Sequence, residues 1–580
     1  MHAGSLRLPA PMGRDHLTRR TFIGGAGLSA LGLYLAACGG SSSKLPPVST
    51  AAAPTTPGAT TSGGGPVAAD IPGLRSAGGK PGGRLVNVFD VEGNSYDPAI
   101  GYSSTGWDAI CNLLFASLYT YDADGSTPIA NAAADMPEVN ADRTVYTIRL
   151  REGVAFHNGR PVVAADYLYA WERVLDPANE SWASSYITTI KGAQELYDGK
   201  AKTLDGVRAV DDMTLEVTLV QPDVTFIYAL TQPFTAPVPK EEVSKYGKDF
   251  STHVVGNGPY RLASYDSVGQ KMVFQRFDAY HWKGLPYVDE IEFQWGIDQG
   301  VQLLKMQRGE AQIMGYGMDS TSRAKASASD AVKKLVFEQP LFASRWINLN
   351  PKTAPAFADV RVRQALNWAT DREQLARLTG GEASAWGQAF PKDMLAGATR
   401  TFPGYGTDPA KAQSLLADAG VKELSFTMWI SADPEPQIAQ ILQQQWKAIG
   451  VDVKLKKATP EAINELTLKG KIDSWISTYY AIYPTAIDVV SQYWETGGSA
   501  NYTAYSSAQV DALMQQARAE EDTAARNGLL AQIEAIVGDE AAGVFVENVN
   551  WIMGVDQDRV KNFHYSGVYG TIYDRLWVEA

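Results

Sequence analysis

The sequence predicts a large α/β protein with two or three lobes, on three observations. Residues 408–479 alternate between helix and strand patterns, which is typical of right-handed βαβ units on a largely parallel sheet. The preceding half mixes short strands, a hairpin and single helices. About 500 of the 580 residues follow the N-terminal segments described below, and that length is too great for one simple domain.

The first half shows both strand and helix periodicities. Alternation with period two predicts strands, and apolar residues spaced three and four apart predict helices. We expect a strand at 83–89, a helix at 107–117, a strand at 144–150, a helix within 161–175 and a hairpin at 207–219. No internal repeat is visible in the sequence.

The second half is more regular. Asp408 is a suitable N-cap, Pro409 fits the first helical position, and Gly420 is a suitable stop signal. After this helix we expect strands at 424–430, 451–455 and 472–479, separated by helices at 436–449 and 460–469. Two apolar helical stripes follow at 510–517 and 529–537, and a strand-like segment at 543–549.

The N-terminus has the layout of a bacterial export signal. Arg19 and Arg20 precede an apolar run from Phe22 to Ala37, which resembles a twin-arginine signal. Leu35-Ala36-Ala37-Cys38 resembles a lipobox, in which Cys38 receives a diacylglycerol and becomes the new N-terminus. The apolar run is shorter than the roughly 20 residues that span a bilayer, and it contains several glycines. We therefore expect a signal peptide at 1–37 and a lipid-anchored protein on the extracytoplasmic face of the cell membrane.

Residues 38–81 are rich in Gly, Ser, Thr, Ala and Pro and almost free of large apolar side chains. Such a segment cannot bury enough surface to offset the entropy lost on ordering. We expect it to be a flexible tether between the anchor and the folded part.

Composition excludes several function classes. The net charge is −13 and no basic run is present, which argues against nucleic acid as a partner. Cys38 is assigned to the anchor, so Cys111 has no partner for a disulfide or a cysteine metal site. The four histidines after residue 38 are scattered, so neither a metal nor a cofactor is expected.

Catalytic signatures are missing from the sequence. It has no Gly-x-Ser-x-Gly, no His-Glu-x-x-His and no Gly-x-x-x-x-Gly-Lys pattern. An exported, multi-lobed α/β protein without such a signature favours a binding function over an enzyme. A cleft between lobes that closes on its ligand is the physical expectation.

Several motifs resemble those of one family of binding proteins. They are the segment 142–162, Ala165-Asp166-Tyr167 with Trp171, Asp211-Asp212-x-Thr214, Pro237-Val238-Pro239-Lys240, Asn257-Gly258-Pro259-Tyr260, and the segment 357–366 with Asp371-Arg372. Together they resemble the solute-binding proteins of peptide ABC transporters, family 5, oligopeptide-binding branch. The resemblance runs from about residue 82 to the C-terminus.

This resemblance implies a bilobal fold of the periplasmic-binding-protein type, class II, with an additional third lobe. Lobe one would comprise 82–118, 240–342 and 531–580; lobe two 119–239; and lobe three 343–530. The family implies an oligopeptide or peptide-like ligand held as an added β-strand in the cleft. It also implies ABC permease subunits with a cytoplasmic ATPase as partners.

The implied ligand strand lies at residues 477–481. The ligand-binding residues that the resemblance implies are Ser103, Ser104, Trp182, Asn348, Thr478, Tyr479, Tyr480 and Ile482. No catalytic residue is expected among them.

The sequence departs from the family at the charged anchors. Ala481-Ile482-Tyr483 replaces the usual Ala-Asp-Tyr, whose aspartate pairs with the peptide ammonium group. A family acid is missing at Asn348, and the cation often found near Ile476 is absent. We expect a peptide with a blocked or differently placed terminus, or a less charged solute. Asp488, six residues on, is a candidate replacement for the missing aspartate.

Three alternatives stay open. The same fold could carry a non-peptide solute such as a nickel chelate or haem, which the few histidines disfavour. An extracellular hydrolase would show turnover of peptides or glycans. A sensor or adhesin would act without transport.

Overall fold

The computed structural model describes residues 78–579, except 103, 123–124, 316, 379–382 and 432–433. The signal peptide, Cys38 and nearly all of the tether therefore lie outside the described residues. Within the described ranges, no helix combines the length and apolarity needed to cross a membrane.

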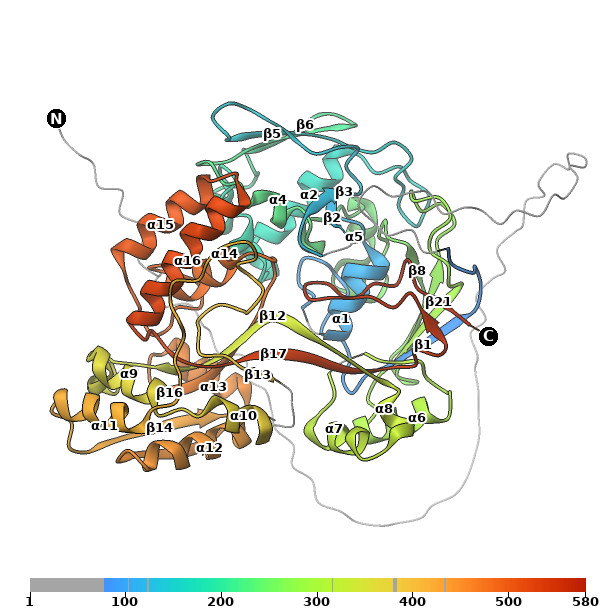
Figure 1. Ribbon diagram of the computed structural model, residues 1–580. Helices are drawn as coiled ribbons and strands as arrows, with labels where there is room; N and C mark the ends of the chain where they lie inside the picture. The colour runs from blue at the N-terminus through green and yellow to red at the C-terminus, as the bar shows by residue number, and fades with distance from the viewer. Residues whose placement is uncertain are drawn as a thin grey trace, which may run out of the picture. The chain divides into compact units, whose positions relative to one another are not determined.

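One mixed sheet of eleven strands organises the described chain (Figure 1). Its order is β15-β14-β16-β12-β17-β11-β1-β10-β9-β8, with β13 beside β17. The strands are β1 Arg84–Val88, β8 Tyr260–Asp266, β9 Lys271–Arg276, β10 Glu290–Gln294, β11 Ile313–Met314, β12 Val336–Leu349, β13 Ala383–Ala385, β14 Leu424–Ile430, β15 Val451–Lys457, β16 Ser474–Tyr480 and β17 Val544–Val555.

The prediction of a largely parallel sheet in the second half is wrong for the sheet as a whole. β14 is parallel to β15 and to β16, as βαβ units require. However, β16 pairs antiparallel with β12, and β12 pairs antiparallel with β17. Both of these strands reach the sheet from outside the βαβ segment, so the local alternation of helices and strands does not reveal them.

β12 and β17 are the longest strands, and they pair along most of their length. In Figure 1 they run side by side between the β14–β16 part and the β1–β8 part. Their register shifts between Pro340 and Ser344 and again between Arg345 and Trp346. Such β-bulges bend a strand pair and redirect its side chains.

A separate four-stranded antiparallel sheet lies within residues 119–239, in the order β4-β5-β7-β6. Its strands are β4 Glu138–Val139, β5 Val145–Arg149, β6 Val207–Asp211 and β7 Thr214–Thr218. The remaining two-stranded pairs are β2 Tyr119–Tyr121 with β3 Pro128–Ala130, β18 Val560–Lys561 with β21 Trp577–Val578, and β19 Tyr565–Ser566 with β20 Gly570–Thr571.

The helices of the first half are short. They are α1 Ser104–Ala109, α2 Ala164–Leu175, α3 Ala193–Tyr197, α4 Phe226–Ala229, α5 Lys240–Tyr246, α6 Gln299–Gln307, α7 Ser320–Ser327 and α8 Asp330–Lys333. A π-helical turn, Ile110–Leu114, continues α1, so the helix expected at 107–117 begins and ends earlier.

The second half contains α9 Val360–Trp368, α10 Arg372–Leu378, α11 Pro409–Asp418, α12 Glu435–Lys447, α13 Pro460–Leu468, α14 Ala486–Val489, α15 Ala508–Ala519 and α16 Thr523–Asp539. The predicted cap of α11 is confirmed, because the Asp408 carboxylate accepts the Lys411 N–H at 2.9 Å.

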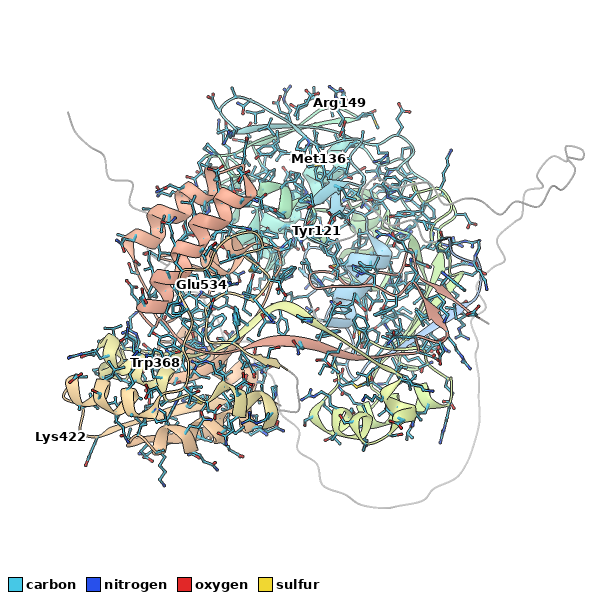
Figure 2. The ribbon with its side chains drawn as sticks, in the orientation of Figure 1. Tyr121, Met136, Arg149, Trp368, Lys422 and Glu534 are labelled. Carbon is cyan, nitrogen blue, oxygen red and sulfur yellow. The ribbon has the colours of Figure 1, made fainter. Side chains whose placement is uncertain are left out.

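Separate apolar clusters form the core. The largest contains Leu85, Phe89 and Tyr121, together with the helix α2. Figure 2 labels Tyr121, which packs against Tyr228 and Tyr569 at 6.3 and 5.1 Å between ring centroids. Figure 2 also labels Glu534 on α16, whose buried carboxylate pairs with Arg400.

The two ends of the described chain meet. Lys80 Nζ lies 3.1 Å from Glu579 Oε1 and 4.9 Å from the ring centroid of Trp577. The chain thus enters and leaves the fold at adjacent positions.

Candidate functional site

Three cavities adjoin one another around the end of β16. We call them the apolar cavity, of about 400 Å³, the charged cavity, of about 460 Å³, and the tyrosine cavity, of about 290 Å³. Tyr480 lines all three, so they are parts of one cleft. Each cavity has a volume typical of pockets that bind small ligands.

The cavities differ in their walls. The apolar cavity is lined by Asp90, Val91, Tyr102, Trp107, Asp108, Gly315, Leu341, Tyr480, Ala481, Ile482, Trp551, Tyr565, Gly567, Val568 and Gly570. The charged cavity is lined by Asp90, Gln299, Gly317, Met318, Asp319, Arg323, Arg345, Ser431, Pro434, Glu435, Thr478, Tyr480, Val549, Asn550, Trp551 and Ile552. The tyrosine cavity is lined by Tyr102, Trp182, Ser185, Tyr186, Thr478, Tyr479, Tyr480, Ile482, Gln492, Tyr493, Ser499, Ala500 and Tyr502.

β16 places its C-terminal half in the cleft. It pairs with β12 along its whole length, but only Ser474 and Trp475 pair with β14. In the described sheet, residues 476–479 therefore have a strand neighbour on the β12 side only. The other backbone edge of this segment is positioned to accept an added strand.

Aromatic rings form most of the tyrosine cavity. Trp182 packs against Tyr102 and Tyr186, at 4.6 and 5.9 Å between ring centroids. Its indole N–H donates to the Gly101 carbonyl at 3.2 Å, which fixes the ring at the wall. Rings of this kind offer a large contact area at low entropic cost, and their faces attract cations.

Asp488 holds the turn after β16 in place. Its carboxylate accepts the Tyr479 hydroxyl at 2.6 Å, the Ile482 N–H at 2.8 Å and the Gln492 amide at 2.8 Å. Burial raises its pKa to about 6, and these hydrogen bonds offset only part of that increase. Asp488 is not among the residues that line the three cavities, so this geometry assigns it a structural role.

Ile482, by contrast, faces the apolar and tyrosine cavities. Its carbonyl accepts the Gln232 side-chain amide at 2.9 Å, which connects the turn to the 119–239 segment. The position where the resemblance expects an aspartate thus presents an apolar side chain to the cleft.

A buried ion pair lies beside the charged cavity. The Arg345 guanidinium pairs with the Glu547 carboxylate, and both side chains are almost fully buried. Arg345 Nε also donates to Thr478 Oγ1 at 2.9 Å. The strand register explains the cluster, because Arg345 on β12 lies opposite Thr478 on β16 and Glu547 on β17.

Three further carboxylates line the charged cavity. Asp319 caps α7 by accepting the Ser322 N–H at 2.6 Å, and Glu435 accepts the Ser431 N–H at 2.6 Å. Burial raises the pKa of Glu435. Asp90 differs, because its buried Oδ1 has no hydrogen-bond partner in the described part of the chain.

Five of the residues expected at the site line the cleft: Trp182, Thr478, Tyr479, Tyr480 and Ile482. Asn348 does not line the three cavities. It accepts from the Trp346 indole at 3.0 Å and donates to Ser477 Oγ at 2.7 Å. Ser103 lies outside the described residues, and Ser104 begins α1 without a described side chain.

Other cleft residues were not anticipated. Arg345 is the only charged residue between Leu341 and Leu349, and because arginine is seldom buried unless it is paired, its place in this run is a signal that the sequence offers. Asp90 follows a predicted strand directly, a position where ligands often bind in α/β sheets. Trp551 and Tyr565, whose rings stack at 5.1 Å, give no comparable sequence signal.

Relatives with similar sequences are binding proteins. The dipeptide-binding protein DppE of Bacillus subtilis is 28% identical over 480 residues, covering 78% of this chain and 84% of that protein. The glutathione-binding protein GsiB of Salmonella typhimurium is 30% identical over 378 residues, covering 64% of this chain and 69% of that protein.

Solved structures confirm the expected fold class. Haemophilus influenzae OppA in complex with the peptide RPPGFSPFR gives a TM-score of 0.69 at 25% identity, covering 85% of this chain and 99% of that one. The clavulanic acid biosynthesis oligopeptide binding protein 2 gives 0.77 at 21% identity, covering 86% and 96%. The sequence pattern of one family matches residues 127–501. The chain belongs to the bacterial extracellular solute-binding proteins, family 5.

Proposed function

We propose that this protein captures oligopeptides or peptide-like solutes in the cleft around β16 and delivers them to an ABC importer. The main observation behind this proposal is that, in the described sheet, residues 476–479 pair with β12 and have no strand neighbour on their other edge. This edge lies beside the three adjoining cavities. A peptide laid along this edge would exchange backbone hydrogen bonds with β16, and its side chains would occupy the cavities. The peptide-bound relative and the names of the sequence relatives support this proposal.

We also propose which lobes close on the ligand and which residues contact it. Lobes at 82–118 with 240–342 and 531–580, at 119–239, and at 343–530 would close on the ligand. Trp182, Thr478, Tyr479, Tyr480 and Ile482 would contact it. The protein would bind and release its ligand without turnover.

Location and partners are also part of the proposal. A twin-arginine-type signal at 1–37 would direct export, and lipid on Cys38 would hold the protein at the extracytoplasmic face of the cell membrane. Permease subunits with a cytoplasmic ATPase would receive the solute.

Native mass spectrometry of the purified full chain tests the ligand class. A retained mass that fragments into amino-acid residues, and that random tripeptide to pentapeptide mixtures displace, is the expected result. Retention of a chelate, haem or another non-peptide solute would contradict the peptide assignment. Consumption of the added peptides would contradict the receptor role.

A further inference from the structure

The carboxyl end of β1 lies at a topological switch point of the sheet. β1 pairs in parallel with β10 on one side and with β11 on the other. After β1 the chain passes through the 119–239 segment and rejoins the sheet at β8, on the β10 side of β1. After β11 it continues to β12, on the opposite side. In sheets of this kind, ligands bind in the crevice where successive connections diverge. Asp90 follows β1 at this crevice.

The backbone fixes Asp90 beside two cavities. Phe89, its neighbour, donates to the Gln294 carbonyl at 2.7 Å and accepts the Ile297 N–H at 3.1 Å. Asp90 lines both the apolar and the charged cavity. The crevice at the end of β1 is therefore the junction between them.

Among the residues that the structure describes, the carboxylate of Asp90 lacks the backbone hydrogen bonds that the other two carboxylates of the charged cavity accept. Asp319 and Glu435 each accept a backbone N–H, whereas the buried Oδ1 of Asp90 accepts none from the residues described. An unpaired buried acceptor is unfavourable and calls for an explanation. Asp90 as a whole is only half-buried and lines both cavities, so a ligand there that donates to its carboxylate would provide one.

The surroundings favour a cationic donor. Trp551 and Tyr480 line the same two cavities, and aromatic faces attract cations. The cations of the charged cavity are engaged elsewhere: Arg345 pairs with Glu547, and Arg323 donates to the Met318 carbonyl. Ile482 lines the apolar cavity together with Asp90. Because its side chain is uncharged, it cannot pair with an ammonium group, whereas Asp90 can.

We propose that Asp90 binds a cationic group of the ligand, an ammonium or guanidinium flanked by Trp551 and Tyr480. The charge recognition that this chain lacks at Ile482 would then lie at the carboxyl end of β1. This inference rests on the proposed peptide-binding function and specifies its substrate class. The cation could be the peptide's terminal amine or a basic side chain, since both present the same chemistry.

Calorimetric titration of the purified full chain tests the inference with three probes. They are the C-terminal amides of tetra-alanine, N-acetyl-tetra-alanine and N-acetyl-Ala-Lys-Ala-Ala, so that only the first and third carry a positive charge. The variant is Asp90→Asn, which keeps the size and removes the charge. Asp408→Asn is the matched control, because it removes a carboxylate that caps a helix, α11, and does not line the three cavities. Thermal unfolding of each variant checks that the fold is retained.

We expect Asp90→Asn to weaken at least one cationic probe by about ten- to hundredfold, the loss of one charged hydrogen bond. The acetylated neutral probe should bind both proteins equally. A loss with tetra-alanine assigns the terminal amine, and a loss with the lysine probe assigns a basic side chain.

Unchanged binding of both cationic probes to Asp90→Asn would overturn the inference. An equal loss for the neutral probe, or an equal effect of Asp408→Asn, would overturn it as well. These outcomes leave the peptide proposal intact. If the wild-type protein binds none of the probes, the peptide proposal fails together with the role of Asp90.

Discussion

Asp488 combines full burial with a carboxyl pKa raised to about 6 from the usual 3.8. The folded protein therefore holds this proton more tightly than the unfolded chain does. Between about pH 4 and pH 6 the unfolded chain loses the proton first, so the contribution of Asp488 to stability falls as the pH rises. Below and above this window the contribution is constant.

Comparison with Asp488→Asn isolates this effect. We expect the free energy of unfolding of the wild type, relative to the variant, to fall by about 3 kcal/mol between those pH values. Urea denaturation at a series of pH values measures the difference. A difference that does not change with pH would show that Asp488 titrates normally.

The pair Arg345–Glu547 makes a second prediction for single residues. Arg345→Met leaves a buried carboxylate without its cation, and we expect a loss of about 3–5 kcal/mol in the free energy of unfolding. Arg345→Met with Glu547→Leu should recover most of this loss, because the uncompensated charge is then absent. Chemical denaturation of the single and double variants gives the coupling. Additive losses would exclude an energetic pairing.

At the scale of elements, the edge of β16 that has no strand neighbour in the described sheet predicts how a peptide ligand binds. A peptide added alongside residues 476–479 directs every second backbone N–H toward β16. N-methylation at these positions should weaken binding by about two- to tenfold per site. Methylation at the alternate positions, whose N–H groups point away, is the matched control. A methylation scan by calorimetry with no alternation would contradict strand addition.

The sequence predicts local elements well and long-range pairing poorly. The strand at 424–430 coincides with β14, because its alternation is clear and turn residues flank it. β12 and β17 meet across about two hundred residues of chain, and no local pattern encodes which strand will pair with which.

The same limit applies to the site. Tyr479, Tyr480 and Ile482 could be placed through the resemblance, because they share one strand and the turn that follows it. Asp90 and Arg345 enter the cleft through sheet order and register, which only the assembled structure provides.

For the whole molecule, the N-terminal signals predict where the protein resides. Cys38→Ala removes the sulfur that would carry the lipid, and two acyl chains are what hold a protein firmly to a bilayer. We expect the variant to move from the membrane fraction to the soluble extracytoplasmic fraction with unchanged ligand binding. Cell fractionation with immunoblotting measures this. A variant that stays in the membrane fraction would exclude anchoring through Cys38.

The contact of Lys80 with Glu579 and Trp577 also has a practical consequence. A reporter inserted directly after Glu579 would emerge next to the segment that leads back to Cys38. The same adjacency suits circular permutation: a short glycine-serine bridge could join the two ends, and new ends could be opened in a surface loop.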